Sequence, residues 1–177
     1  MRATSCLFLV FSTALSVTAC SPSAVPAAVA AAAAGGASEI PEEMCRVTQA
    51  PGAPFVPPAP YPANPPSKDL FWYGTAALWT QLPADGDWGQ LALGEKVFWW
   101  NAGYVWDEEP SPELAVEARQ LDGEATASFP GPATNAYHPT FQSAILTGID
   151  LPTAGCWEIT GKYRGTELSF VVWVPAD

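Results

Sequence analysis

The chain has 177 residues, of which 14% are charged, and its 18 acidic residues against 7 basic ones give a formal net charge of −11 at pH 7. This balance excludes a nucleic-acid partner, because binding to phosphates requires clustered lysine and arginine. It also excludes docking on anionic lipid through a polybasic stretch. The acidic residues are scattered along the chain, and we interpret them as a source of solubility.

The first 20 residues have the pattern of an export signal. Arg2 gives a positive start, residues 6–11 are an apolar run, and small residues lead to Cys20. The run is shorter than the about 20 apolar residues that a spanning helix needs. The tetrapeptide Val17-Thr18-Ala19-Cys20 resembles the lipobox of bacterial lipoproteins, which implies that Cys20 is diacylated, becomes the first mature residue and anchors the exported protein to a membrane. The alternative is an ordinary secretory signal that leaves Cys20 as a thiol.

Two segments of biased composition follow the signal at residues 1–19. Residues 20–40 are nearly all Ala, Gly, Ser, Pro and Val, which predicts a flexible lipidated tether. Residues 41–67 are rich in proline, with eight prolines in the 16 residues from 51 to 66. Proline removes backbone donors, so this segment cannot be a central strand. It is either a strap packed on the domain or a ligand for a proline-binding groove.

The cysteines separate by position. Cys6 leaves with the signal, and the lipobox resemblance assigns Cys20 to the lipid. Cys45 and Cys156 then lie in a compartment where disulfides persist, so we predict a bridge between them. Two distant cysteines and one histidine give no ligand cluster for a metal, and no cofactor is expected.

Residues 68–177 consist of short apolar runs separated by Gly, Pro and Asp turns, which predicts an all-β domain. The last 23 residues are the clearest: alternating apolar residues flank a turn at Arg164-Gly165 and indicate a β-hairpin. Further strands are predicted at residues 70–73, 77–80, 96–100, 114–119 and 142–151. Several short strands at this spacing favour an immunoglobulin-like antiparallel β-sandwich.

The segment Leu151-Pro-Thr-Ala-Gly-Cys-Trp-Glu-Ile-Thr-Gly looks like the corner between strands E and F of bacterial immunoglobulin-like domains. The resemblance covers about the last 35 residues. It implies a shape only and assigns no catalytic or binding residue.

The chain offers little for catalysis. His138 is the only histidine, and no nucleophile elbow, phosphate loop or zinc-binding helix accompanies it. The acidic clusters at 85–87 and 107–109 could serve glycoside hydrolysis or hold calcium, but they adjoin glycine or proline, where solvated loops are expected. An envelope hydrolase using Asp107 and Glu109 with His138 is therefore the less favoured hypothesis, and we expect no enzyme.

The eight tryptophans are the most informative side chains. Trp99 and Trp100 are consecutive on a predicted strand, so their rings must point to opposite faces. Trp88 and Trp106 lie in loop-like sequence. We therefore take Trp88, Trp100 and Trp106 as candidates for contact with a sugar or a protein. The alternative is that the Pro-rich segment or long loops cover these rings in a second apolar cluster.

Taken together, the sequence predicts a monomeric lipoprotein outside the cytoplasm, anchored to the cell membrane or outer membrane of a bacterium. We expect a non-catalytic binding or structural module for an envelope protein or glycan.

Overall fold

The computed structural model describes residues 45–88, 96–129 and 131–176, all of which belong to a compact unit spanning 37–177. Cys20 and the predicted divisions after residues 19 and 40 lie outside the described residues. Within these ranges, no helix is long and apolar enough to cross a membrane. The described residues form nine strands: β1 Leu70–Thr75, β2 Leu78–Pro83, β3 Lys96–Trp100, β4 Ala115–Gln120, β5 Thr126–Ser128, β6 Thr134–His138, β7 Gln142–Gly148, β8 Gly155–Tyr163 and β9 Thr166–Val174.

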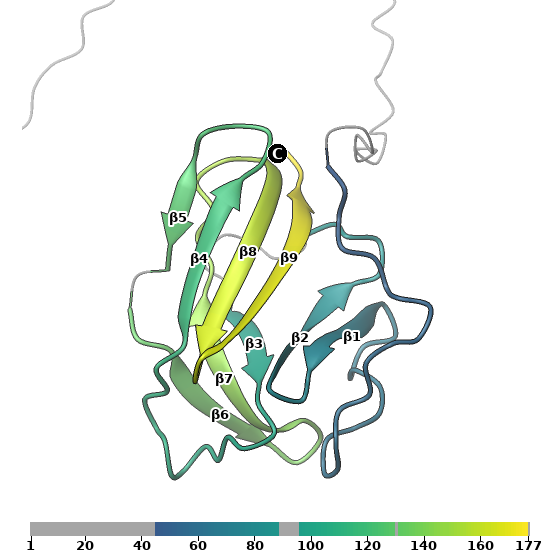
Figure 1. Cartoon of the computed structure of the whole chain (residues 1–177), viewed down its shortest axis with the longest axis vertical. Coiled ribbons are helices and arrows are strands. Elements are labelled where there is room, and N and C mark those ends of the chain that lie inside the picture. The colour runs from purple at the N-terminus through teal and green to yellow at the C-terminus, as the bar shows by residue number, and fades with distance from the viewer. Residues whose placement is uncertain (1–44, 89–95, 130, 177) are drawn as a thin grey trace, which may run out of the picture. The chain divides into compact units, whose positions relative to one another are not determined.

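The strands form two antiparallel sheets, one in the order β1-β2-β3-β7-β6 and the other in the order β5-β4-β8-β9 (Figure 1). If β2 is lettered A, the order A-B-E-D faces C′-C-F-G, with β1 added at one edge. This is the arrangement of an immunoglobulin-like sandwich, as the sequence predicts. The segment that resembles the E–F corner joins β7 to β8, the strands in those positions.

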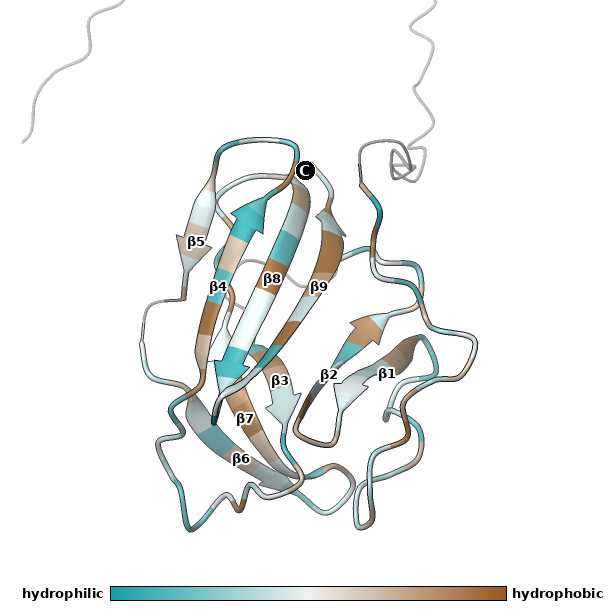
Figure 2. Ribbon diagram, viewed as in Figure 1, coloured by the Kyte–Doolittle hydropathy of each residue, from teal (hydrophilic) through white to brown (hydrophobic). Residues whose placement is uncertain are grey.

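The predicted C-terminal hairpin is confirmed. β8 and β9 pair along their whole length, from Gly155↔Val174 to Tyr163↔Thr166. Arg164 and Gly165 form the turn with φ values of 47° and 77°, which suits the right-handed twist of the flanking strands. Figure 2 shows hydrophilic and hydrophobic bands alternating along β4 and β8, so one face of these strands is apolar.

The main core lies between the two sheets. Trp99 from β3 and Phe170 from β9 meet with ring centroids 5.7 Å apart. Gly161 on β8 makes room for the Trp99 indole, because a Cβ at this position would lie 2.5 Å from its ring. The large aromatic residues buried in this core are Phe71, Trp88, Trp99, Tyr104, Trp157, Tyr163 and Phe170.

A second apolar cluster forms around Trp72, Trp79 and Trp100. Trp99 belongs to the main core and Trp100 to this cluster, which confirms that their rings point to opposite faces. The Pro-rich segment packs here: Phe55 and Tyr61 lie 5.6 and 5.0 Å from the Trp79 ring. The second cluster is therefore on the outer face of the β1-containing sheet, covered by this segment.

The predicted disulfide between Cys45 and Cys156 is present, with a Cα–Cα distance of 5.4 Å and a sequence separation of 111. It attaches the N-terminal part of the Pro-rich segment to β8. Just downstream, the Thr48 amide donates to the Val171 carbonyl (2.8 Å), and the Val171 amide donates to the Thr48 hydroxyl (2.8 Å). These bonds cover part of the exposed edge of β9, where unpaired backbone groups would invite association with other strands.

Candidate functional site

The three tryptophans chosen from the sequence differ in their exposure to solvent. Trp88 and Trp100 are 2% and 1% exposed, so neither presents an open ring face to a ligand at the surface. Trp88 packs on Phe170 in the main core, and Trp100 meets Trp72 at a centroid distance of 4.9 Å. For these two rings the expectation of stacking on a ligand is wrong, because other side chains of the protein cover their faces. Trp106 remains, 38% exposed.

Trp106 lies in the β3–β4 loop and stacks against Tyr137 of β6. Their ring centroids are 5.7 Å apart with an interplanar angle of 26°. Tyr137 is 50% exposed and the neighbouring Val105 is 40% exposed. Asn135 on β6 donates to the Trp106 carbonyl (2.7 Å), which joins the loop to the strand. We call these exposed rings the Trp106–Tyr137 surface.

The loop that carries Trp106 is anchored on both sides of this residue. The buried Tyr104 donates to the backbone carbonyl of Glu109 (3.1 Å). The Glu109 carboxylate accepts hydrogen bonds from the Tyr163 hydroxyl (2.8 Å) and from the Arg164 guanidinium (2.5 Å). Arg164 also donates to the Gly103 carbonyl (3.0 Å), so the tip of the β8–β9 hairpin holds the loop in place.

The ionisable groups of this anchor are shifted by their surroundings. Burial acts to raise the pKa of the Glu109 carboxyl, but the hydrogen bonds from Tyr163 and Arg164 outweigh it and hold the pKa below its ordinary value. Burial raises the pKa of Tyr104 to about 12, and the charge of Glu109 adds to this shift. Glu109 is therefore ionised and Tyr104 neutral at neutral pH, as the anchor requires.

The residues of the hydrolase hypothesis have separate surroundings. The His138 ring stacks on Phe141 at 4.9 Å, and its Nδ1 accepts a hydrogen bond from the Thr140 amide (3.1 Å). Among the described lining of the cavity beside His138, about 330 Å³ in volume, neither Asp107 nor Glu109 occurs. Glu109 is instead engaged in the loop anchor.

The acidic cluster at 85–87 forms a turn, in which Asp85 accepts a hydrogen bond from the Asp87 amide (3.1 Å) and Gly86 has a φ of 74°. Within the described ranges, no group of three or more His, Cys, Asp or Glu side chains could hold a metal ion.

Sequence reasoning missed Tyr137 and Asn135. The run Thr134–His138 forms the edge strand β6, but it has only one large apolar side chain and gives no alternating pattern. The stacking of Tyr137 on Trp106 joins residues 31 positions apart in the chain. They meet because β7 pairs with β6 on one side and with β3, which precedes the Trp106 loop, on the other.

Comparison with known proteins adds little. No protein-family model and no curated protein sequence matches this chain. Among solved structures, the chain is similar to the crystal structure of a "putative lipoprotein" from Bacillus anthracis, at 11% identity and a TM-score of 0.37, over 75% of this chain and 89% of that one. This likeness transfers no residue, ligand or activity.

Proposed function

We propose that this protein is a lipid-anchored, extracytoplasmic binding module that recognises a carbohydrate of the cell envelope without catalysis. The observation that carries the proposal is the Trp106–Tyr137 surface, a pair of exposed stacked rings on an anchored loop. Exposed aromatic side chains have apolar ring faces that pack against the apolar faces of sugars. Trp106 is held before any ligand arrives, which reduces the ordering that binding requires.

Polar residues next to Trp106 in the chain support a sugar as the ligand. Asp107 and Glu108, which follow Trp106 directly, are exposed and offer carboxylate oxygens to hydroxyl donors. An apolar ring face next to acceptors is the combination that a pyranose requires. A protein partner would use the same rings, so the test must discriminate between the two.

The sequence pattern and the disulfide support this extracytoplasmic location. Cys20 stands where the lipobox places the acylated cysteine, and the Cys45–Cys156 disulfide suits an oxidising compartment outside the cytoplasm. The replacement Cys20→Ala should move the protein from the membrane to the soluble fraction and abolish labelling with a fatty-acid probe. Unchanged membrane fractionation would contradict the anchor.

Binding can be tested with purified envelope polysaccharide in a co-sedimentation assay. We expect Trp106→Ala and Tyr137→Ala each to weaken retention about tenfold or more, the loss usual for an aromatic anchor of an interface. Val56→Ala is the matched control, because Val56 is 61% exposed on the Pro-rich segment. Equal retention of all variants, or no retention of the unmodified protein, would refute the carbohydrate proposal. Retention by a crude envelope fraction, absent with the purified polysaccharide and lost after protease treatment of that fraction, would indicate a protein partner instead.

A further inference from the structure

A second candidate site lies where β2 and β3 separate. The two strands pair only at Trp79↔Trp100 and Thr80↔Trp99. Beyond this point β2 continues to pair with β1 as far as Pro83, and β3 continues to pair with β7 as far as Lys96. The two strands therefore diverge like a fork (Figure 1). Residues of β1, β2 and β3 line a cavity here, which we call the fork cavity.

The fork cavity has a volume of about 270 Å³. This approaches the range of about 300 Å³ and above that is usual for small-molecule sites. It adjoins the cavity beside His138, because Leu70, Gln81 and Phe98 line both. Its apolar lining is formed by Leu70, Pro83, Trp88, Val97 and Phe98. The size and lining suit one aromatic or branched aliphatic group.

Two buried polar atoms of the lining have no hydrogen-bond partner in the described part of the chain: the indole Nε1 of Trp88 and the amide Oε1 of Gln81. Trp88 is 2% exposed. A buried polar group without a partner is unfavourable, by about 1–3 kcal/mol, so such groups call for an explanation. One is a donor and the other an acceptor, and an amide group complements both: its N–H suits Gln81 and its carbonyl suits Trp88.

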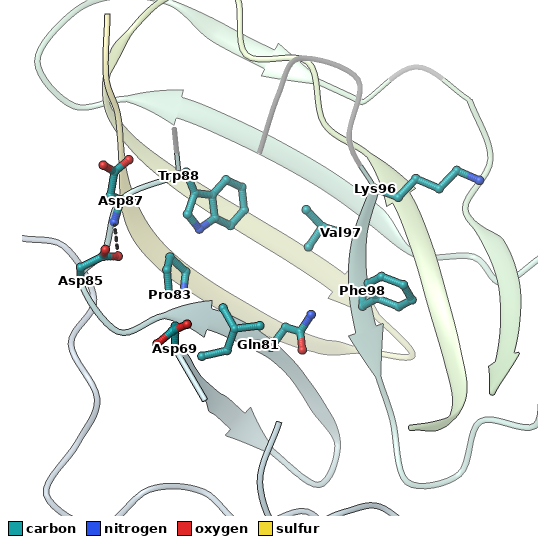
Figure 3. A pocket seen from close by; sticks show the side chains of 10 residues that line it. Asp69, Gln81, Pro83, Asp85, Asp87, Trp88, Lys96, Val97 and Phe98 are labelled. Carbon is teal, nitrogen blue, oxygen red and sulfur yellow. Dashed lines mark hydrogen bonds between the residues drawn. The ribbon is translucent and has the colours of Figure 1, made fainter. Parts of the chain in front are cut away.

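Charge at the mouth of the fork cavity is uneven. Figure 3 shows Asp69, Asp85 and Asp87 together at one end, while the ammonium of Lys96 points away from the cavity at the other. Asp69 and Asp85 are exposed. This end favours a positively charged group on the ligand.

We propose that the fork cavity binds a small amide that carries one apolar group and one positive charge. Its apolar group lies among Leu70, Val97 and Phe98, its amide joins Gln81 and Trp88, and its cation faces Asp69 and Asp85. Trp88 would thus contact a ligand through the N–H at the edge of its ring, although Phe170 packs against the ring. The described lining of this site shares no residue with the Trp106–Tyr137 surface, so either proposal can fail without the other.

Calorimetric titration with three related probes tests the ligand class. Phenylalaninamide carries the ring, the amide and a positive charge; N-acetylphenylalaninamide is its neutral counterpart, and N-acetylphenylalanine is negatively charged. We expect phenylalaninamide to bind most tightly and N-acetylphenylalanine most weakly. Absence of binding by phenylalaninamide, or equal binding of all three, would overturn the proposal.

Variants test the assigned residues. Gln81→Met keeps the size of the side chain and removes the acceptor, and should weaken phenylalaninamide binding about tenfold. Trp88→Phe should weaken it by a similar factor. Asp85→Asn, which retains an oxygen for the Asp87 amide, should weaken it about threefold, the effect expected of an exposed ion pair. Glu124→Gln removes an exposed charge outside the lining and should leave affinity unchanged. Near-UV circular dichroism confirms that each variant is folded. Affinities that do not change in folded Gln81→Met and Trp88→Phe would refute the site.

Discussion

At Gly161 the absence of a Cβ atom allows the two sheets to pack, because a Cβ would lie 2.5 Å from the Trp99 ring. Gly161 faces the Trp99 indole, which is fully buried and cannot move aside. Interiors of proteins are packed at the density of organic crystals, so an added methyl group has no free space to occupy. The absence of a side chain at Gly161 is therefore a requirement of packing against the facing sheet.

Gly161→Ala should destabilise the domain by about 1–3 kcal/mol, the range for overpacking a core. Urea unfolding followed by tryptophan fluorescence measures this change. The control is Gly148→Ala at the end of β7, where a Cβ would meet no atom within 4 Å. Equal stability of the Gly161→Ala variant and the unmodified protein would contradict the packing described for Trp99.

Glu109 links stability to pH. Its folded-state pKa is below the ordinary value of 4.5, so its contribution is fully present above about pH 4.5 and is lost as the pH falls through the folded-state value. Glu109→Gln should lower the free energy of unfolding by about 1–3 kcal/mol at pH 7, because it weakens hydrogen bonds to a charged group. The difference between variant and unmodified protein should shrink on acidification. Glu108→Gln, at an exposed neighbour, should have no such effect; a difference that is independent of pH would contradict this role of the carboxylate.

At the scale of elements, the Pro-rich segment forms part of the sandwich. Tyr61 and Phe55 cover Trp79, and the Trp72 indole donates to the Pro62 carbonyl (3.1 Å). Prolines leave this segment few backbone donors for a sheet, so its side chains and carbonyls make the contacts. Without the segment, Trp72 and Trp79 on the outer face of the sheet would be exposed to water.

Phe55→Ala or Tyr61→Ala should therefore destabilise the protein by about 1 kcal/mol, because both side chains are partly buried and full burial of such a side chain contributes about 1.5–3 kcal/mol. The emission of tryptophan should also shift to longer wavelength, because water reaches Trp79. Val56→Ala in the same segment tests whether the effect depends on burial. An unchanged emission spectrum in both aromatic variants would show that the segment does not shield the cluster.

Among the connections between elements, the disulfide should make the largest single contribution to the free energy of unfolding. Its removal by Cys45→Ala with Cys156→Ala should lower the free energy of unfolding by about 4.7 kcal/mol, the chain-entropy figure for a loop of roughly 100 residues. Urea unfolding compares this variant with the unmodified protein, with and without reductant. Addition of reductant should affect only the unmodified protein. A free thiol at Cys45 or Cys156 in the denatured, unreduced protein would contradict the bridge.

At the scale of the molecule, stability resides in the unit spanning residues 37–177, which holds every contact described above. A mature chain from which residues 21–36 are removed should therefore unfold at the same temperature as the unmodified mature chain. Differential scanning calorimetry measures both. A clear fall in the unfolding temperature of the shortened chain would show that the N-terminal residues stabilise the domain.

The sequence by itself determined the strands whose pattern is local and strong. Alternation of apolar residues defined β4, β8 and β9, the opposite orientation of Trp99 and Trp100 followed from strand geometry, and the turn at Arg164-Gly165 followed from its residues. The pairing of Cys45 with Cys156 followed from the two cysteines that remain after the predicted signal and lipobox. Each of these properties depends on neighbours in sequence or on composition.

Only the tertiary structure decided which aromatic rings are accessible. Trp88 and Trp106 both lie in loop-like sequence, but Trp88 is covered by Phe170, which is distant in the chain, whereas Trp106 is 38% exposed. The Trp106–Tyr137 surface and the fork cavity both depend on which strands pair and where the pairing ends. Gln81 and Phe98, for example, line the fork cavity because they lie just beyond the last pair between β2 and β3. The physical reason is that burial is a property of the whole arrangement of the chain, whereas propensity and alternation act over a few residues.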